Sequence, residues 1–257
     1  KGAYSYAWMI IFAVIAAIMV LIGLYHIRML PSNQIPSTTK KTTSEVGREL
    51  VAVIANFFTK KHIFYYICFI ILYRLAEGFI MKIAPLFLRA SREVGGLGLS
   101  LKEIGTLNGV FGSAAFVLGS LLAGIYVSKF GLKRTLFTLC CIFNLPFLAY
   151  TFLAVTQPTN VYLIGTCITM EYFGYGFGFV GLTLFMMQQI APGKHQMSHY
   201  AFASGIMNLG VMLPGMVSGY FSDLLGYRNF FIYVLIATIP AFLITYFIPF
   251  TYDDSKK

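Results

Sequence analysis

Long apolar stretches, each about as long as a helix that crosses a bilayer, recur from one end of this sequence to the other. A hydrocarbon core about 30 Å thick needs roughly 20 apolar residues in an α-helix. Seven stretches meet this requirement: 4–30, 62–89, 102–127, 135–156, 160–190, 198–222 and 229–250. Strands of a membrane barrel run only about 9–11 residues and alternate apolar with polar positions. The sequence therefore predicts an all-α membrane protein, since helices satisfy their own backbone groups in lipid.

The composition excludes most soluble classes. Apolar residues make up 58% of the chain and charged residues 11%, whereas soluble domains carry about 45–50% and about 25%. A soluble enzyme would therefore lack the polar surface that it needs in water. The net charge of +10 does not indicate a nucleic-acid partner, because the basic residues stand in short clusters between apolar stretches. That arrangement is typical of the signal that orients membrane helices.

The basic residues predict which loops face the cytoplasm, where Lys and Arg accumulate. One set of loops carries Arg28, Lys40, Lys41, Arg48, Lys60, Lys61, Lys129, Lys133, Arg134, Lys194, Lys256 and Lys257. The opposite set carries Lys1, Arg89, Arg92, Lys102 and Arg228. This excess places residues 31–61 and the C-terminus in the cytoplasm, and Lys1 outside. Seven spans with an outside start indicate a fragment of a longer protein.

One long polar connection, residues 31–61, divides the chain. It contains Pro31, Pro36 and a Ser/Thr/Lys run over 37–44, which is the composition of a linker. Within it, we expect residues 46–58 to form a short interfacial helix, with Phe57 and Phe58 facing lipid. The predicted parts are a single helix over 1–30, a cytoplasmic linker over 31–61, and a six-helix block over 62–257.

The six-helix block contains an internal repeat. Gly124 to Gly131 and Gly219 to Gly226 share the spacing G-x-x-x-[S/D]-x-x-G, at an offset of 95 residues. Because three spans separate the copies, the copies face opposite sides of the membrane. This predicts inverted 3+3 repeats, which place a binding site near the midplane. Glu77 and Glu171, the acids deep within spans, lie 94 residues apart and agree with the repeat.

Charged groups inside a span usually face a cavity or a partner. Arg74 and Glu77 are three residues apart, so they share a helix face and can pair. Lys82 lies eight residues after Arg74, about 12 Å along the helix axis. Two interpretations stay open: a pair that only locks this helix, or a set of charges that acts in binding or coupling.

Glu171 opens a stretch rich in glycine and aromatic residues. Gly174, Gly178 and Gly181 follow on nearly the same face, where small residues let another helix approach. Tyr172 and Tyr175 lie close to that face, and aromatic rings with hydroxyls suit sugars. Further polar residues in spans, which either bond to other helices or contact a ligand, are Asn108, Asn144, Gln188, Gln189 and Asn208.

Chemical motifs of enzymes and metal sites are weak in this sequence. The cysteines form no C-x-x-C pair, and His195 and His199 alone make a weak metal signal. There is no Walker A sequence and no convincing catalytic cluster. We therefore expect no enzyme, no cofactor and no metal site.

The loop from Gly124 to Arg134 resembles the signature G-x-x-x-D-R-x-G-R-[RK] of the major facilitator superfamily. The matching positions are Gly124, Ser128, Lys129, Gly131, Lys133 and Arg134. Ser128 replaces the usual Asp, so this position lacks the carboxylate of the family's gating salt bridge. The resemblance implies that this loop takes part in gating. It also implies that the chain is the C-terminal half of a twelve-helix carrier, preceded by one helix of a missing N-terminal half.

Residues 60–250 are also similar to AmpG-type muropeptide permeases and the related acetyl-CoA transporters. The carrying residues are Tyr73 to Glu77, Pro85 to Leu88, Gly98 to Gly105, and Phe202 to Phe231 with its Gly215 and Gly219. The resemblance implies a multi-pass protein of the bacterial inner membrane that imports a muropeptide or amino-sugar-like solute, with protons. The alternatives are a carrier of another oligosaccharide, sugar acid or organic anion, or a non-transporting receptor or scaffold.

These observations assign roles to particular residues. The substrate and coupling candidates are Arg74, Glu77, Lys82, Glu171, Tyr73, Tyr172, Tyr175 and Asn108. Helix-packing candidates are Gly174, Gly178, Gly181, Gly215 and Gly219. We expect Glu77 to stay ionised beside Arg74, and Glu171 to be the protonatable group, because a desolvated acid without a cation favours its neutral form. Arg74 is expected to meet an anionic part of the solute.

Overall fold

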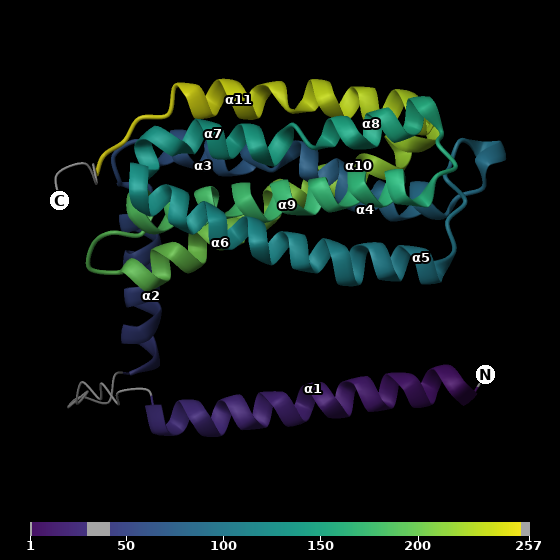
Figure 1. Ribbon diagram of the computed structural model, residues 1–257. Coiled ribbons are helices and arrows are strands. Elements are labelled where there is room, and N and C mark those ends of the chain that lie inside the picture. Colours follow the sequence, from purple (N-terminus) through teal and green to yellow (C-terminus); the bar gives the residue numbers. More distant parts are fainter. Residues whose placement is uncertain (1, 30–41, 253–257) are drawn as a thin grey trace. The chain divides into compact units, whose positions relative to one another are not determined.

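The computed structural model describes residues 2–29 and 42–252 (Figure 1). In this part of the chain every regular element is a helix, as predicted. The chain forms two compact units, Lys1–Gly47 and Arg48–Lys257. The first part of the predicted linker, residues 31–41, lies outside the described residues. The predicted division of the chain after residues 30 and 61 therefore stays a prediction.

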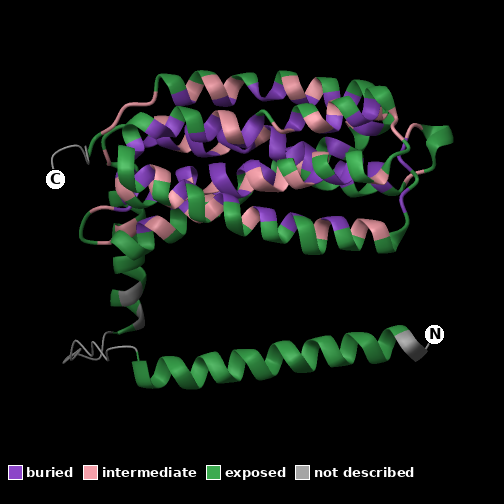
Figure 2. Cartoon of the chain, in the orientation of Figure 1, coloured by how far each residue is buried: buried purple, intermediate pink, exposed green. Residues whose placement is uncertain are grey.

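The first unit contains α1 (Gly2–Met29), which coincides with the first apolar stretch. Its described side chains are exposed along its whole length (Figure 2). An apolar helix with no packed face is suited to lipid or to a partner helix.

The second unit is a bundle whose spans are mostly built from two or three consecutive helices. The first two spans are α3 (Ile63–Tyr73) with α4 (Leu75–Arg89), and α5 (Leu101–Thr106) with the π-helix η2 (Leu107–Gly112) and α6 (Ser113–Phe130). The third is α7 (Leu132–Asn144) with α8 (Phe147–Thr156). The fourth is α9 (Val161–Phe185) with the π-helix η3 (Met186–Ile190). The last two spans share α10 (Gln196–Ala237), which bends at Gly226, and end with α11 (Ile239–Tyr246).

Two further short helices lie outside the spans of the bundle. The helix α2 (Thr43–Phe58) precedes α3, and the loop after α4 contains the 3₁₀-helix η1 (Arg92–Val94).

Within the described residues, five stretches are long and apolar enough to cross a membrane: Tyr4–Met29, Ile63–Arg89, Leu101–Phe130, Leu132–Thr156 and Gln196–Tyr246. The last of these is 51 residues long and contains the bend at Gly226. The helix α9 is not among these stretches, because Glu171 and its many glycines and tyrosines lower its mean hydropathy.

Backbone features recur at the offset of the predicted repeat. Gly131 (φ 80°, ψ 149°) and Gly226 (φ 68°, ψ 159°) adopt nearly the same conformation, which glycine reaches without strain. The following span is interrupted beside Pro146 in one copy and beside Pro240 in the other, since proline removes a backbone donor. These matches support the inverted repeat, which stays a prediction.

The loops gather at two opposite ends of the bundle. At the predicted outer end, the Arg92 guanidinium donates to the carbonyls of Gln157 (2.9 Å) and Pro158 (2.8 Å). At the predicted cytoplasmic end, the Lys60 ammonium donates to the carbonyls of Ile190 and Pro192. Partial burial lowers the pKa of Lys60. The Lys60 ammonium thus supplies hydrogen bonds to carbonyl groups at the end of η3, where helices leave carbonyls unpaired.

The helix α2 confirms the predicted helix over 46–58, but the orientation expected for Phe57 is wrong. Phe57 is fully buried, and its ring lies 4.8 Å from the ring of Phe202 and 5.7 Å from that of His199. An aromatic side chain gains more from packing against these rings of α10 than from an exposed position.

Gln189 fastens the C-terminal segment to the inner end of the bundle. Its side-chain oxygen accepts from the amides of Thr251 (2.8 Å) and Tyr252 (3.0 Å). Its Nε2 donates to the carbonyl of Tyr252 (2.7 Å). The hydroxyls of Tyr66 and Thr251 share a further bond of 2.7 Å. A polar residue in a span here serves packing between distant segments of the chain.

We expect Gln189→Ala to release this segment. Each buried hydrogen bond contributes about 1 kcal/mol, so hydrogen-exchange protection at Thr251 and Tyr252 should fall about tenfold or more. The neighbouring variant Gln188→Ala is the control and should leave both amides protected. Equal protection in Gln189→Ala and the control would contradict this assignment.

Candidate functional site

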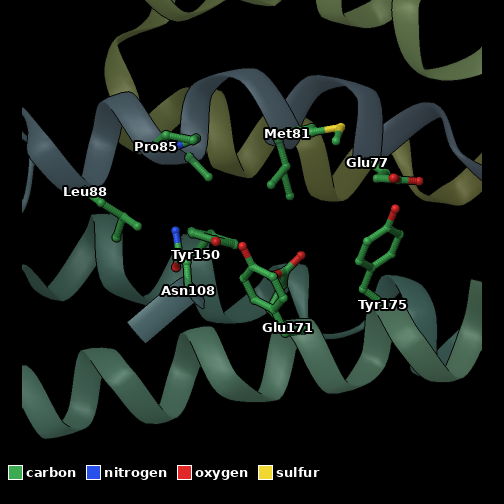
Figure 3. A pocket seen from close by; sticks show the side chains of 11 residues that line it. Glu77, Met81, Pro85, Leu88, Asn108, Tyr150, Glu171 and Tyr175 are labelled. Atoms are coloured by element: carbon green, nitrogen blue, oxygen red, sulfur yellow. The ribbon is translucent and has the colours of Figure 1, made fainter. Parts of the chain in front are cut away.

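A small cavity of about 110 Å³ lies between α4 and α9, with further walls from η2 and α8 (Figure 3). It brings together Glu77 of α4, Asn108 of η2, and Glu171, Tyr172 and Tyr175 of α9. All five were candidates from the sequence, and they come from three elements. The two carboxylates stand on opposite walls, and the hydroxyl of Tyr175 points toward Glu77 (Figure 3).

Arg74 and Glu77 form the predicted ion pair. The chain turns at Arg74 (φ −103°, ψ 6°), between α3 and α4. Its Nε donates to Oε2 of Glu77 at 2.6 Å, and its Nη2 bonds to Oε1. The two residues are only 5% and 6% exposed, and the guanidinium also lies 5.3 Å from the ring centre of Phe179. This bidentate geometry neutralises both charges within one turn of chain.

Glu171 has a different electrostatic environment. It faces the same cavity from α9, yet in the described part of the chain no cation lies within ion-pair distance of it. The pair of Arg74 with Glu77 carries no net charge, so Glu171 contributes the unbalanced charge of this cavity. A charged group in low dielectric without a partner is costly, and a proton or another cation would offset that cost.

Asn108 reaches the cavity from the π-helix η2. Such turns are rare and often occur at functional sites. The Oδ1 atom of Asn108 is buried and has no hydrogen-bond partner among the described residues. An acceptor in this position is available to a donor that enters the cavity.

Glycines let the helices of the site approach closely. A Cβ on Gly174 would lie 2.4 Å from the Ile142 carbonyl oxygen, and one on Gly178 would lie 2.2 Å from Cβ of Phe143. Gly181 similarly faces Leu139 at 2.8 Å. These three residues let α9 approach α7 closely. A Cβ on Gly78, a residue that was not predicted, would lie 2.6 Å from the Val211 carbonyl oxygen. Gly78 therefore lets α4 approach α10 closely.

Other candidates lie away from the cavity. Tyr73 is fully buried in the core, and its hydroxyl donates to the Gly178 carbonyl at 2.9 Å. Lys82 is exposed, and its side chain runs beside Gly215, where a Cβ would lie 3.4 Å from Lys82 Cγ. Nothing in the described chain lies within 4 Å of a Cβ on Gly219. The packing role predicted for Gly219 therefore stays a prediction.

The predicted gating loop joins α6 to α7. Ser128 donates to the Ile125 carbonyl at 2.8 Å, and Lys129 lies 5.4 Å from the ring centre of Phe130. Gly131 supplies the left-handed turn, while Lys133 and Arg134 are exposed in the first turn of α7. Among the described residues, a Cβ on Gly124 would meet no neighbouring atom within 4 Å. The role of this loop in gating stays a prediction.

Sequence reasoning missed the apolar side of the cavity and one tyrosine. The wall from α4 is formed by Ile80, Met81, Ala84, Pro85 and Leu88. These residues follow Glu77 at helical intervals, so the sequence could have placed them on the same helix face as Glu77. Tyr150 of α8 also lines the cavity, but it stands among ordinary apolar residues and carries no local signal.

Comparison with known proteins supports the same class. The sequence profile described as Major Facilitator Superfamily matches residues 2–192. The anhydromuropeptide permease of Escherichia coli (strain K12) is 23% identical over 209 residues, or 81% of this chain and 41% of that protein.

Two rickettsial proteins are similarly related. The putative transporter AmpG 1 of Rickettsia bellii (strain RML369-C) is 25% identical over 228 residues, or 88% of this chain and 53% of that protein. The putative transporter AmpG 2 of Rickettsia prowazekii (strain Madrid E) is 27% identical over 204 residues, or 77% and 47%.

This chain spans about half the length of the curated relatives that it matches. These three relatives are named as a permease and putative transporters, and the profile match extends over most of the chain. The resemblances to the major facilitator superfamily and to AmpG-type permeases are therefore confirmed, as are the all-α membrane fold and the expectation of a transporter instead of an enzyme. The chain belongs to the Major Facilitator Superfamily of multi-pass membrane transporters.

Proposed function

We propose that this chain is the C-terminal half, with the preceding helix and linker, of a proton-coupled importer of the bacterial inner membrane. The proposed solute is a muropeptide or a similar amino-sugar compound. The observation that carries the proposal is the cavity shared by Glu77 and Glu171, in which Glu77, but not Glu171, is paired with a cation among the described residues. The names of the relatives support the class of solute.

In the proposed mechanism, Glu171 binds and releases the proton. The Arg74–Glu77 pair stays ionised and neutral overall, since each partner stabilises the other's charge. Protonation of Glu171 removes the one unbalanced charge of the cavity. The helices α4 and α9 can then move relative to each other without carrying a bare charge through low dielectric.

The solute itself requires more space than this cavity offers. Small-molecule sites measure about 300–1,000 Å³, whereas the cavity here measures about 110 Å³. We infer that the N-terminal half completes the solute site and that this chain provides one wall. Tyr172 and Tyr175 would contact sugar rings, and a carboxylate of the solute would compete with Glu77 for Arg74. Lys82 and Tyr73, which do not line the cavity, would act in transport from outside this wall.

Uptake by the full-length carrier in sealed vesicles tests this proposal. We expect a labelled anhydromuropeptide to accumulate when a proton gradient is imposed, and unlabelled anhydromuropeptide to compete more strongly than neutral oligosaccharides or sugar acids. Vesicles without the carrier give the background. Stronger competition by a sugar acid would identify the alternative solute class. Uptake at background level with every solute would support a receptor or scaffold instead.

A further inference from the structure

A second, larger hollow of about 730 Å³ lies on the predicted outer half of the bundle, between α5–η2 and the first turns of α9. We call it the lateral groove. Leu107 and Met170 line the groove, whereas Asn108 and Glu171, the next residues in the chain, line the small cavity. Successive residues of a helix point about 100° apart. The lateral groove therefore opens on a different face from the proposed proton site.

The depth of the groove matches one leaflet of a bilayer. It runs from Lys102, at the start of α5, to Phe111 in η2. Nine residues at 1.5 Å per residue give about 14 Å, which is close to half of a hydrocarbon core about 30 Å thick. The mouth lies at the end of the bundle that the basic residues place outside.

The polarity of the wall changes with depth. Ser100, Lys102 and Tyr162 stand at the mouth, and tyrosine is enriched at the membrane interface. At the inner end, Phe111 and Met170 are 53% and 60% exposed. A polar mouth above an apolar floor fits a molecule with a polar head and a hydrocarbon chain.

Threonines between the mouth and the floor offer no hydroxyl hydrogen to a polar solute. Thr106 and Thr166 donate to carbonyls of their own helices at 2.9 Å, and Thr169 does so at 2.7 Å. Their methyl groups remain for contact in the groove. A carbohydrate needs donors as well as acceptors in its site, so this wall favours an acyl chain.

The charge at the mouth favours an anionic head group. The Glu103 carboxylate accepts from the amide (2.8 Å) and the hydroxyl (2.7 Å) of Ser100, which caps α5. Lys102 has no carboxylate within ion-pair distance in the described part of the chain. Its ammonium is therefore available to a phosphate.

We propose that the lateral groove binds one phospholipid of the outer leaflet. Its phosphate lies at Lys102, and one acyl chain lies over Phe111 and Met170. This lipid would occupy the space between the second and fourth spans without blocking the face that carries Glu171. The proposal does not require that Glu171 carries a proton.

The test uses the full-length carrier in nanodiscs that contain phosphatidylglycerol with a photoreactive group in its acyl chain. After illumination, we expect adducts on peptides that contain Phe111 or Met170. Thr166→Trp places a large ring in the groove and should reduce these adducts to background. Lys102→Gln should lower labelling by phosphatidylglycerol about fivefold, since one basic residue near a lipid head group contributes about 1 kcal/mol.

Thr156→Trp is the matched control, because Thr156 is also an exposed threonine bonded to its own helix but lies outside the groove. It should leave labelling unchanged. Labelling that persists in Thr166→Trp would overturn the proposal. Absence of adducts in the full-length carrier would do the same, because the rest of the protein would then cover the groove. Protection by excess anhydromuropeptide would assign the groove to the solute instead.

Discussion

Replacing Glu171 with glutamine is expected to abolish proton-driven accumulation of solute while leaving counterflow exchange partly intact. Glutamine has the size of the protonated acid and cannot release a proton. The variant thus fixes the cavity in the state that we assign to the protonated carrier. Uptake down the solute gradient and exchange of internal for external solute need the moving helices, but they need no net proton transfer. Measurement of accumulation ratios under an imposed pH gradient checks the first effect, and counterflow checks the second.

The structure gives the reason to separate Glu171 from Glu77. Both line the cavity, yet both oxygens of Glu77 are occupied by Arg74, whereas Glu171 has no cation within ion-pair distance in the described residues. The charge of Glu77 is therefore stabilised in all conditions in which the pair persists. The charge of Glu171 is balanced only when a proton or another cation arrives.

Two further variants sharpen this prediction. Glu171→Asp retains a titratable carboxyl and should recover part of the accumulation. Glu93→Gln removes an exposed carboxylate of η1 and should leave accumulation unchanged. Normal accumulation by Glu171→Gln would show that the residue only packs α9 against its neighbours. Coupling would then reside elsewhere in the carrier.

The second large effect is expected from Arg74→Ala, which should lower both stability and solute binding. Loss of one partner leaves Glu77 as an unpaired charge in a site that is 6% exposed. Breaking a buried pair in this way costs about 3–5 kcal/mol. A thermal unfolding scan of the purified carrier should show a clear fall in the midpoint, and labelled solute should bind at background level.

A double variant separates the structural role of Arg74 from its role in binding. Arg74→Met combined with Glu77→Leu removes both charges and should restore most of the stability, since apolar groups of similar size often replace a buried pair at little cost. Solute binding should stay absent if Arg74 contacts the solute. Arg89→Ala, which removes an exposed cation at the end of α4, should change neither property. Full transport by the double variant would mean that the pair only stabilises the turn between α3 and α4.

Some features of the site followed from the sequence because they are local. Arg74 and Glu77 are three residues apart, and a helix turn alone brings them together. The glycines after Glu171 lie on one face because of the helical period, and the structure places α7 against that face. Proline and glycine act locally in the same way: the spans are interrupted beside Pro146 and Pro240 and the chain turns at Gly131, since these residues limit or extend the backbone conformations directly.

Other features depended on contacts between segments far apart in the chain. Gln189 was a polar residue of unknown partner until the structure placed it beside Thr251 and Tyr252. Tyr73 was a candidate for solute contact, yet it is buried with its hydroxyl on Gly178. Phe57 was expected to face lipid, but the rings of His199 and Phe202 cover it. No local period encodes which distant helix will cover a given face.

The sequence by itself determined that this chain is a set of membrane helices, because backbone groups in lipid must bond within their own helix and about 20 apolar residues span the core. It also determined the Arg74–Glu77 pair and the face of α9 that is formed by glycines. Only the tertiary structure decided that Glu77, Asn108, Tyr150 and Glu171 share one cavity. Their meeting depends on which helices pack together and on how closely glycines let them approach, and these are properties of side-chain fit across the whole bundle.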